Sequence, residues 1–249
     1  MLPDGETHYT ITSFAMATFV LLFYDLYYAE FYIAGSKRGS YVMEKKRRIV
    51  TRRLDEEDNS QVRKRSWRPG TMLAPVPAVM VSCGGAKDYK PNIITLAWAG
   101  TVCSEPPLLS VSIRPSRYSY EIISKTGEFV VNVTTAKLAR ATDWCGVKSG
   151  RDFDKFEHCR LTPFPSDIVK APGIAECPIN MECQVRRVLK LGSHDMFIAE
   201  IKAVHVSEEL LDKRGKLRLD KAELLAFSHG EYFVLGSRLG HFGYSVRKK

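Results

Sequence analysis

Between residues 75 and 240 the chain consists of short β-rich runs separated by turn residues, and this spacing limits its fold more than any other feature. Runs of Val, Ile, Thr and aromatic residues bounded by Gly, Pro, Asn and Asp are typical of strands. The strands that we expect are 75–85, 92–103, 107–113, 128–135, a long hairpin over 178–206, and 231–240. No repeating βαβ pattern of about 30 residues occurs. The sequence therefore predicts a mainly β fold with short helices (α+β) and about six strands, in a closed or nearly closed antiparallel barrel.

Two short helices are expected between these strands. Residues 116–127 predict a helix with Ser116 as its candidate N-cap and the final glycine as its stop. Residues 136–146 predict a second helix, also ended by its final glycine. Residues 147–173 are rich in Pro, Gly and Asp, so we expect them to be mostly loop.

The first 66 residues differ in character from the rest. They contain an apolar segment over 11–34, a basic run over 37–53 and a polar, mixed-charge linker over 54–66. Such a linker is typical of a boundary between a domain and an appended segment. We therefore expect residues 1–66 to be an N-terminal extension outside the fold, and residues 67–249 to form the domain.

The apolar segment leaves three interpretations open. Residues 11–24 carry no charge, but they are shorter than the roughly 20 residues that span a bilayer, and Asp25 and Glu30 interrupt the continuation. A membrane anchor that tolerated these acids would keep the domain in the cytoplasm, because eight Lys and Arg residues follow it within 35–53. Alternatively, the segment is a poorly ordered or loosely helical extension. Such an extension would also arise from an upstream translation start that is not part of the functional protein. The third interpretation is a helix that packs on the domain.

Charge and cysteine content narrow the function classes. The net charge is +9, of which residues 67–249 contribute +7. This excess suits an anionic ligand or a polyanion, and it is also what an ordinary solvated surface shows. The six cysteines include no CxxC pair, so zinc and iron–sulfur sites are not expected and reduced, mostly buried thiols are. Reduced thiols are typical of the cytoplasm, so we expect a cytoplasmic location. Membrane contact is expected only if residues 11–34 are an anchor.

Sequence motifs for several common chemistries are absent. The chain has no GxGxxG, no GxxxxGK[ST] and no GxSxG. No pair of acids has a spacing that marks a hydrolase. A cofactor that brings its own reactivity would account for this, because the protein then supplies binding, orientation and electrostatics.

The run 92–103 has one unusually bare face. Alternation places Ile94, Leu96, Trp98 and Val102 on one side and Ile93, Thr95, Ala97, Ala99 and Thr101 on the other. The second set is small enough for a flat group to approach the backbone, with the Thr95 hydroxyl and the Asn92 amide nearby. Packing against a helix would explain the same small residues.

The turn 114–119 adds an anion-binding signal. Ser116, Arg117 and Ser119 lie where a helix is expected to begin, and a helix N-terminus offers free N–H groups and a positive dipole end. Arginine can add a charge-assisted hydrogen bond to a phosphate. Together with the small-faced strand, this indicates one ligand with a ring at one end and a phosphate at the other. Flavin mononucleotide (FMN) fits that description.

Five stretches, in this order, resemble a known family: WRPGTMLAPVPAVMVSC, NIITLAWAGTVCSEPPLLSVSIRPSRYSYEII, GEFVVNV, GSHDMFIAEI and YFVLGSRLGHFGYS. The chain over about 67–245 is similar to the flavin reductase-like FMN-binding split-barrel family, nearest the flavoredoxin-type branch. The resemblance implies a six-stranded antiparallel Greek-key barrel, non-covalent FMN and a homodimer with FMN near the subunit interface. It says nothing about residues 1–66.

The resemblance also implies roles for individual residues. The isoalloxazine ring would be lined by Asn92, Thr95, Ala97 and Trp98, and the phosphate or ribityl chain would be held by Ser116, Arg117 and Ser119. Further cofactor contacts would come from Asn132 and, in the loop 149–156, from Lys155. His194 would lie near a pyridine nucleotide substrate, and Tyr232 and Phe242 would close the pocket.

The leading functional hypothesis is an NAD(P)H-dependent flavin oxidoreductase. The acceptor would be free flavin, ferric iron or a partner protein, and no side-chain acid or base is required. The alternative is an FMN-bearing electron carrier of flavoredoxin type without its own NAD(P)H site. A third hypothesis is a binding module whose basic run at 37–53 contacts nucleic acid or anionic lipid; we do not expect nucleic acid to be a partner of the domain itself.

Overall fold

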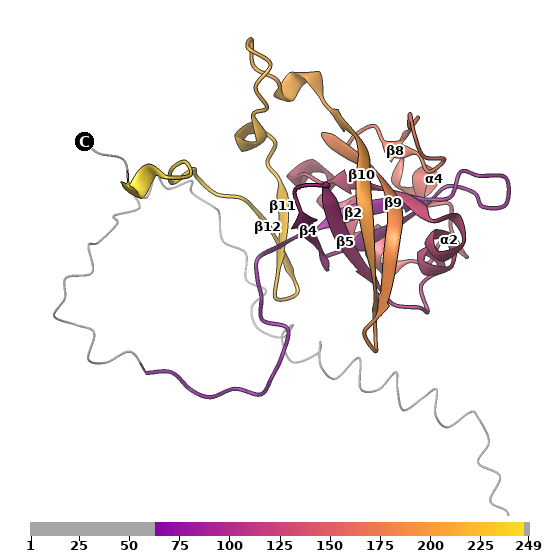
Figure 1. The fold of residues 1–249 in the computed structure, drawn as a ribbon, viewed down its shortest axis with the longest axis horizontal. Coiled ribbons are helices and arrows are strands. Elements are labelled where there is room, and N and C mark those ends of the chain that lie inside the picture. The colour runs from indigo at the N-terminus through magenta and orange to yellow at the C-terminus, as the bar shows by residue number, and fades with distance from the viewer. Residues whose placement is uncertain (1–62, 247–249) are drawn as a thin grey trace, which may run out of the picture. The chain divides into compact units, whose positions relative to one another are not determined.

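The computed structural model describes residues 63–246, and all the elements below lie in the unit that spans 67–249 (Figure 1). The apolar segment 11–34 and the basic run 37–53 lie outside the described residues. No helix within the described part of the chain is long and apolar enough to cross a membrane.

The main sheet is antiparallel throughout. Its strand order is β3–β2–β6–β9–β10–β5–β4, and each neighbouring pair runs in opposite directions. The bounds are β2 Val79–Cys83, β3 Asn92–Leu96, β4 Ala99–Cys103, β5 Leu108–Ile113, β6 Glu128–Val133, β9 Ile179–Lys190 and β10 Asp195–Val206. The predicted mainly β, antiparallel fold is confirmed, and the predicted hairpin over 178–206 is β9 and β10.

The prediction of a single strand over 92–103 is wrong. β3 pairs with β2 and β4 pairs with β5, so the two halves stand at opposite ends of the sheet. Only Ala97 and Trp98 separate them, which limits the distance between Leu96 and Ala99 to about 11 Å. The sheet must therefore curl until its ends adjoin, and the Ser112 N–H donates to the Trp98 carbonyl at 2.9 Å beside this corner. The main sheet of the described residues has seven strands rather than about six because this run is divided.

Two helix boundaries also differ from the prediction. Helix α2 (Tyr118–Thr126) has Arg117 as its N-cap rather than Ser116, because residues 114–117 form a turn in which the Arg117 N–H donates to the Arg114 carbonyl at 3.0 Å. The predicted stop is confirmed: Gly127 has φ 70°, the left-handed conformation that glycine adopts freely.

The second predicted helix is a 3₁₀ turn (η3, Ala136–Leu138) followed by α3 (Ala139–Val147), so Gly146 lies inside the helix and does not end it. A short helix, α4 (Lys155–Cys159), lies within the region predicted to be mostly loop. Its N-cap Asp154 accepts a hydrogen bond from the Glu157 N–H at 3.1 Å, and this Asp-x-x-Glu spacing is a helix-start signal that the sequence carries.

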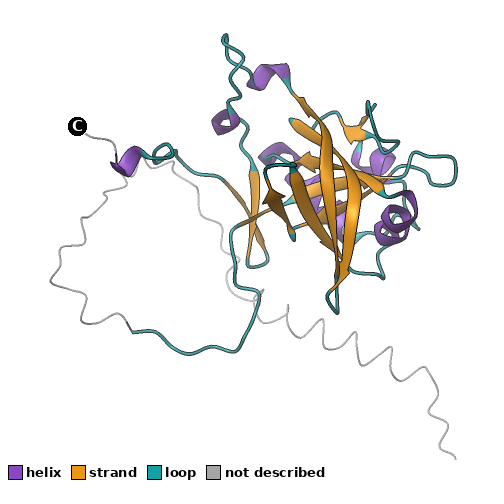
Figure 2. Ribbon diagram, in the orientation of Figure 1, coloured by secondary structure: helices purple, strands orange, loops and turns teal. Residues whose placement is uncertain are grey.

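The hydrophobic core has two main parts. One fills the barrel and includes Val81, Val111, Phe129 and Phe197, all fully buried. The other lies between β2 and β3 and the helices α3 and α4, with Met80, Ile93, Cys145 and Phe156 among its members. Figure 2 shows the strands grouped together with the helices around them. Both faces of β3 are therefore covered, one by the barrel interior and one by α3 and α4.

A separate three-stranded sheet joins β1 (Val76–Pro77), β11 (Leu225–Ser228) and β12 (Glu231–Val234). The predicted strand 75–85 is thus divided between β1 and β2, and the predicted 231–240 is shortened to β12. A third, two-stranded sheet pairs β7 (Pro163–Phe164) with β8 (Gly173–Ile174). Short 3₁₀ turns follow β10 at η4 (Glu208–Leu210), precede β11 at η5 (Leu219–Lys221), and end the described chain at η6 (Tyr244–Val246).

Candidate functional site

A basic hollow of about 180 Å³ lies where α2 begins. Its lining comes from β3, the start of α2, the segment that joins α3 to α4, and the first residue of α4. The residues are Ile94, Ser116, Arg117, Tyr118, Ser119, Lys148, Ser149, Arg151 and Lys155. Four of these nine residues are cations and none is an acid, so the hollow suits an anion.

The start of α2 contributes backbone as well as side chains. The first N–H groups of a helix have no partner within the helix, and the N-cap Arg117 makes no side-chain capping bond. The positive end of a nine-residue helix therefore faces a basic hollow. Ser119 Oγ is fixed there, because it accepts a hydrogen bond from Asn92 Nδ2 at 2.8 Å.

The segment 148–151 reaches the hollow because Gly150 packs directly on Asn92. A Cβ at Gly150 would lie 1.9 Å from Asn92 Oδ1, so any larger residue would push the segment away. Arg151 then extends along the helix start, with Nη2 3.3 Å from Glu121 Oε2 and its guanidinium 5.0 Å from the centre of the Tyr118 ring. The close approach at Gly150 thus positions two cations, Lys148 and Arg151, beside Arg117.

Lys155 is the most unusual member of this group. Its side chain is only 3% exposed, and its Nζ donates to the Cys145 carbonyl at 2.7 Å, near the negative end of α3. No carboxylate of the described residues pairs with it. Burial lowers the pKa of this lysine, and nearby Arg117 adds to the effect. A buried cation without an acid partner favours an anionic ligand as the missing charge.

A second hollow, of about 230 Å³, lies at the corner between β3 and β4. It is lined by Ile94, Thr95, Leu96, Ala97, Trp98, Ser112, Ile113, Arg114, Arg117, His194 and Phe227. Most of this lining is apolar or small, which suits a flat, largely apolar group. The hollow therefore lies at the seam where the two ends of the curled sheet meet.

The two hollows share Ile94 and Arg117 and are therefore neighbours. Each is smaller than the roughly 300–1,000 Å³ typical of ligand pockets. A ligand with an anionic end in the basic hollow and a flat end at the corner would use both.

Thr95 both lines a hollow and packs against a helix. Thr95 lines the corner hollow, yet its hydroxyl donates to the Thr142 carbonyl of α3. Gly146 of α3 comes equally close, since a Cβ there would be 3.2 Å from Thr95 Cβ. The residues 93 and 95 therefore pack against a helix, while the free space begins at Ala97, where the strand turns the corner.

A third, more apolar hollow of about 450 Å³ adjoins the corner. It is lined by Gly70, Thr71, Met72, Leu73, Val76, Trp98, Ser112, Leu191, Ser193 and His194. Trp98, Ser112 and His194 belong to both hollows. Burial, followed by the charge of Arg114, lowers the pKa of His194, which favours the neutral ring, and its Nδ1 lies 2.9 Å from Ser193 Oγ.

Residues 72–236 match the family model of the flavin reductase like domain. The chain belongs to this family. Flavoredoxin of Desulfovibrio vulgaris (Miyazaki F) has a similar structure, with a TM-score of 0.69 and 32% identity, covering 74% of this chain and all of that one. An uncharacterized protein of Archaeoglobus fulgidus is 36% identical over 148 residues, 59% of this chain and 82% of that protein. The FMN reductase (NADH) RutF of Acinetobacter baylyi is 28% identical over 109 residues, 43% of this chain and 56% of that protein.

This flavin reductase-like chain has the split-barrel fold, and its family supports flavin binding and an FMN-related oxidoreductase function. Of the residues singled out from the sequence, the structure brings most to the two neighbouring hollows. These are Thr95, Ala97, Trp98, Ser116, Arg117, Ser119, Lys155 and His194. Asn92 lies just behind, bonded to Ser119.

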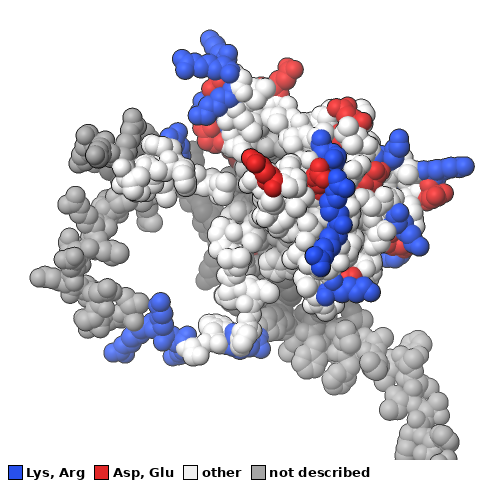
Figure 3. All heavy atoms as spheres, in the orientation of Figure 1, with Lys and Arg blue, Asp and Glu red and all other residues white. Residues whose placement is uncertain are grey.

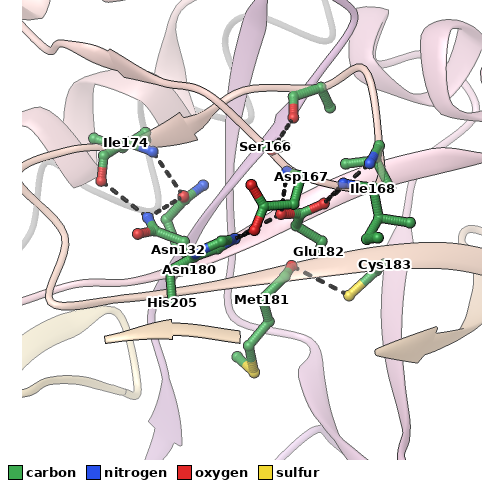
Figure 4. Close-up of polar contacts among 12 residues, drawn as sticks. Asn132, Ser166, Asp167, Ile168, Ile174, Asn180, Met181, Glu182, Cys183 and His205 are labelled. Atoms are coloured by element: carbon green, nitrogen blue, oxygen red, sulfur yellow. Dashed lines mark hydrogen bonds and ion pairs between the residues drawn. The ribbon is translucent and has the colours of Figure 1, made fainter. Parts of the chain in front are cut away.

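Asn132 is not brought to either hollow. It is fully buried, its Nδ2 donates to the Met80 carbonyl and to Ser82 Oγ at 2.9 Å each, and its Oδ1 accepts from the Ile174 N–H at 2.9 Å and from Asn180 Nδ2 at 2.8 Å. Figure 4 shows the contacts to Ile174 and Asn180. In this structure Asn132 ties β6 to its neighbouring strands.

Glu182 forms the other half of the network in Figure 4. Its two oxygens accept from the N–H groups of Asp167, Ile168 and Val169 at 2.7–3.0 Å, and one of them lies 2.6 Å from His205 Nε2. Asp167, Glu182 and His205 have ligand atoms within 4.8 Å of one another, a spacing that could suit a metal ion. Because four donors already occupy the Glu182 oxygens, we interpret the cluster as an anchor for the loop 166–169.

The C-terminal residues differ in how close they come to the corner. Tyr232 does not line the corner hollow, but its ring packs at 5.5 Å from that of Phe227, which does, and its hydroxyl donates to Asp143 Oδ1 at 3.3 Å. Phe242 is fully exposed and lines none of the hollows described.

Several lining residues were missed from the sequence. Phe227 was missed because β11 was not predicted, although two apolar runs flank the turn at His229 and Gly230, whose φ angles are 51° and 90°. Such a two-residue turn with positive φ is a hairpin signal. Lys148 and Arg151 belong to a predicted loop, but their position at the hollow depends on the contact between Gly150 and Asn92.

Proposed function

We propose that the basic hollow and the corner hollow together bind one FMN molecule, with the phosphate at the start of α2 and the ring at Ala97 and Trp98. The observation that carries this proposal is the buried Lys155, which has no acid partner among the described residues, beside Arg117 and an uncapped helix start. Arg117 and Ile94 join the two hollows. FMN carries its phosphate and its ring at opposite ends, so a cationic hollow next to an apolar one suits it.

The residues of the chain have distinct tasks in this arrangement. Arg117, Lys155 and the α2 N–H groups hold the phosphate, and Asn92 fixes Ser119 for the same purpose. Trp98 and Phe227 bound the ring site and exclude water from it. FMN, when bound, supplies the two-electron chemistry, so the protein needs no acid or base of its own.

We infer that the electron donor is NAD(P)H and that it enters through the third hollow, next to the ring site. That hollow is mostly apolar, suits a flat nicotinamide ring, and places the neutral His194 and Ser193 where they can hydrogen-bond an amide. The name of the related RutF, an FMN reductase that uses NADH, supports this donor class. The electron acceptor would be free flavin, ferric iron or a partner protein. The protein itself would be a cytoplasmic homodimer.

An FMN-bearing electron carrier without its own NAD(P)H site is the second candidate. The structural likeness to a flavoredoxin supports it. In that case the third hollow would not bind a nicotinamide nucleotide, and electrons would arrive from another protein.

Anaerobic mixing of the FMN-loaded protein with NADH or NADPH distinguishes the two candidates. The reductase proposal predicts rapid bleaching of the visible flavin absorbance, with saturation in one of the nucleotides. The variant His194→Ala should raise the nucleotide concentration needed for half-maximal bleaching, whereas His241→Ala, which lies outside all three hollows, should not. Full retention of bound FMN with no bleaching by either nucleotide would favour the electron carrier.

A further inference from the structure

Two cysteines from different helices meet beside the basic hollow. Cys145, in the last turn of α3, and Cys159, the final residue of α4, have their Sγ atoms 3.8 Å apart, and both thiols are free. A disulfide needs a separation of about 2.0 Å. The two sulfurs would therefore have to approach by less than about 2 Å.

The packing around the pair holds the two helices in register. The Trp144 and His158 rings stack with their centroids 3.9 Å apart, and the Phe153 ring packs edge-on against both. Lys155 adds its hydrogen bond to the Cys145 carbonyl. Because the helix ends are already in contact, we expect small shifts of the two side chains to be enough to join the sulfurs.

Between the two cysteines runs the segment that carries Lys148, Ser149, Arg151 and Lys155, all of which line the basic hollow. A covalent link between residues 145 and 159 would close this segment into a ring. Cys177 packs in the same apolar cluster, but no other pair of cysteine sulfurs among the described residues is in hydrogen-bond contact.

We propose that Cys145 and Cys159 form a reversible dithiol–disulfide pair that is oxidised by low-molecular-weight disulfides and that restrains the segment 148–154 when linked. The Cys159 thiolate attacks one sulfur of the oxidant RSSR, forming a mixed disulfide and releasing RS⁻. The Cys145 thiolate then attacks the Cys159 sulfur, forming the protein disulfide and releasing a second RS⁻. Two electrons pass from the protein to the oxidant, and the two thiol protons complete two molecules of RSH.

The order and the speed of these steps follow from burial. Cys145 is fully buried, whereas Cys159 is partly exposed, so the oxidant meets Cys159 first. Burial raises the pKa of Cys145 to about 12 and also raises that of Cys159, which leaves little thiolate at neutral pH. The exchange is therefore slow. The oxidised fraction of the pair follows the sustained thiol–disulfide ratio of its surroundings rather than a brief exposure to oxidant.

Trypsin makes the link directly measurable. Cleavage after Lys and Arg places Cys145 in the peptide ATDWCGVK and Cys159 in FEHCR, with no second cysteine in either. The full-length folded protein is equilibrated for hours in glutathione buffers of increasing glutathione disulfide content, quenched with acid, alkylated and digested. We expect the two peptides to appear joined, two hydrogens lighter than their sum, and to separate after dithiothreitol treatment.

Variants test the specificity of the pair. Cys159→Ser and Cys145→Ser should each abolish the linked peptide, whereas Cys103→Ser, which removes a partly exposed thiol elsewhere, should leave it unchanged. The proposal is overturned if both cysteines remain alkylated in the folded protein in buffers that convert Cys103 to a mixed disulfide. It is also overturned if the link appears only in denaturant.

Hydrogen exchange tests the second half of the proposal. Amide exchange over 148–154 should slow in the oxidised protein relative to the reduced one, and Cys159→Ser should show no such difference. Equal exchange in the two forms would exclude the restraint of the segment. None of these measurements requires bound FMN, so they stand apart from the test of the proposed function.

Discussion

Arg117 and Lys155 reach the basic hollow from two different helices, α2 and α4, and differ in how firmly they are held. Arg117 is exposed at the N-cap of α2, while Lys155 is buried under α3. An exposed arginine can adjust to a phosphate and bind it with two hydrogen bonds. A buried lysine is held in one position, and a bound anion would stabilise its charged form.

Replacing Arg117 by alanine should weaken FMN binding without unfolding the domain. A hydrogen bond to a charged group is worth more than a neutral one, so we expect a rise in the dissociation constant on the order of tenfold or more. Fluorescence titration with FMN measures it. Arg140→Ala, which removes an exposed arginine outside both hollows, serves as the control and should bind FMN normally.

The lowered pKa of Lys155 gives FMN binding a characteristic pH dependence. The ammonium form attracts the phosphate, so affinity should be full below the pKa of Lys155 in the free protein and should fall as the pH rises above it. Because that pKa is below the usual lysine value, the fall should begin at lower pH than for an exposed lysine. Lys155→Met should bind FMN more weakly at neutral pH and should lose this fall in affinity at higher pH. An unchanged pH profile would rule out a role for Lys155 in holding the phosphate.

At the scale of the elements, close backbone approaches decide where the site residues point. Gly150 against Asn92 brings the segment 148–151 to α2, and Gly146 against Thr95 brings α3 to β3. Both glycines act through the absence of a Cβ rather than through a special backbone conformation. Two parts of the candidate site therefore depend on residues that line neither hollow.

Gly150→Ala should weaken FMN binding more than it changes stability. The added Cβ would meet Asn92 Oδ1 at 1.9 Å, so the segment must move away and carry Lys148 and Arg151 with it. Because the segment lies at the surface, we expect only a small change in melting temperature. Gly236→Ala, where a Cβ would meet nothing within 4 Å, is the matched control. Equal FMN affinity in both variants would contradict this account of the segment.

The Glu182 anchor is expected to govern acid stability. Burial alone would raise the pKa of Glu182, but the hydrogen bonds from His205 and from the N–H groups of residues 167–169 outweigh it and hold this pKa below its usual value. The stabilisation is therefore present above the unfolded-state pKa and is lost as the pH falls through the folded-state pKa.

Glu182→Gln should lower the free energy of unfolding by about 3 kcal/mol at neutral pH, because an amide presents N–H groups to backbone N–H donors. Urea denaturation across the acid range measures both the loss and its pH dependence. The exposed Glu209→Gln should match the wild type. A Glu182→Gln variant as stable as the wild type would show that the network does not anchor the loop.

The elements differ in how far the sequence could predict them. The hairpin of β9 and β10 was predictable because its two runs pair with each other locally. The corner at Ala97 was not, because alternation continues unbroken from β3 into β4 while their partners, β2 and β5, lie at opposite ends of the sheet. The residues of the 114–119 turn that line the basic hollow were singled out from local chemistry. Lys148, Arg151 and Phe227 were not, since tertiary contacts bring them in.

At the scale of the whole molecule, closure of the sheet creates the candidate site. The ends of the sheet meet at the corner, and the hollow lined by β3, β5 and β11 forms there. Only part of the positive charge of the surface lies at this site. Figure 3 shows basic side chains gathered over the β9–β10 hairpin, where Arg186 and Lys202 pair with Glu200 at 2.7 and 2.9 Å.

Removal of residues 1–66 should leave FMN affinity unchanged. Among the described residues, all those that line the basic and corner hollows lie within 67–249. Titration of the truncated and full-length chains with FMN measures this, with circular dichroism to confirm folding. A large loss of affinity in a folded truncated domain would mean that the extension contributes to the site.

The central claim, that one ligand spans a cationic hollow and an apolar corner, is tested most directly by titrating the flavin-free protein with FMN and with riboflavin, which has the ring but no phosphate. We predict saturation at one FMN per chain, riboflavin binding weaker on the order of tenfold or more, and loss of both by Ala97→Leu. Equal affinities for the two flavins, or saturable FMN binding that survives Ala97→Leu undiminished, would contradict the account.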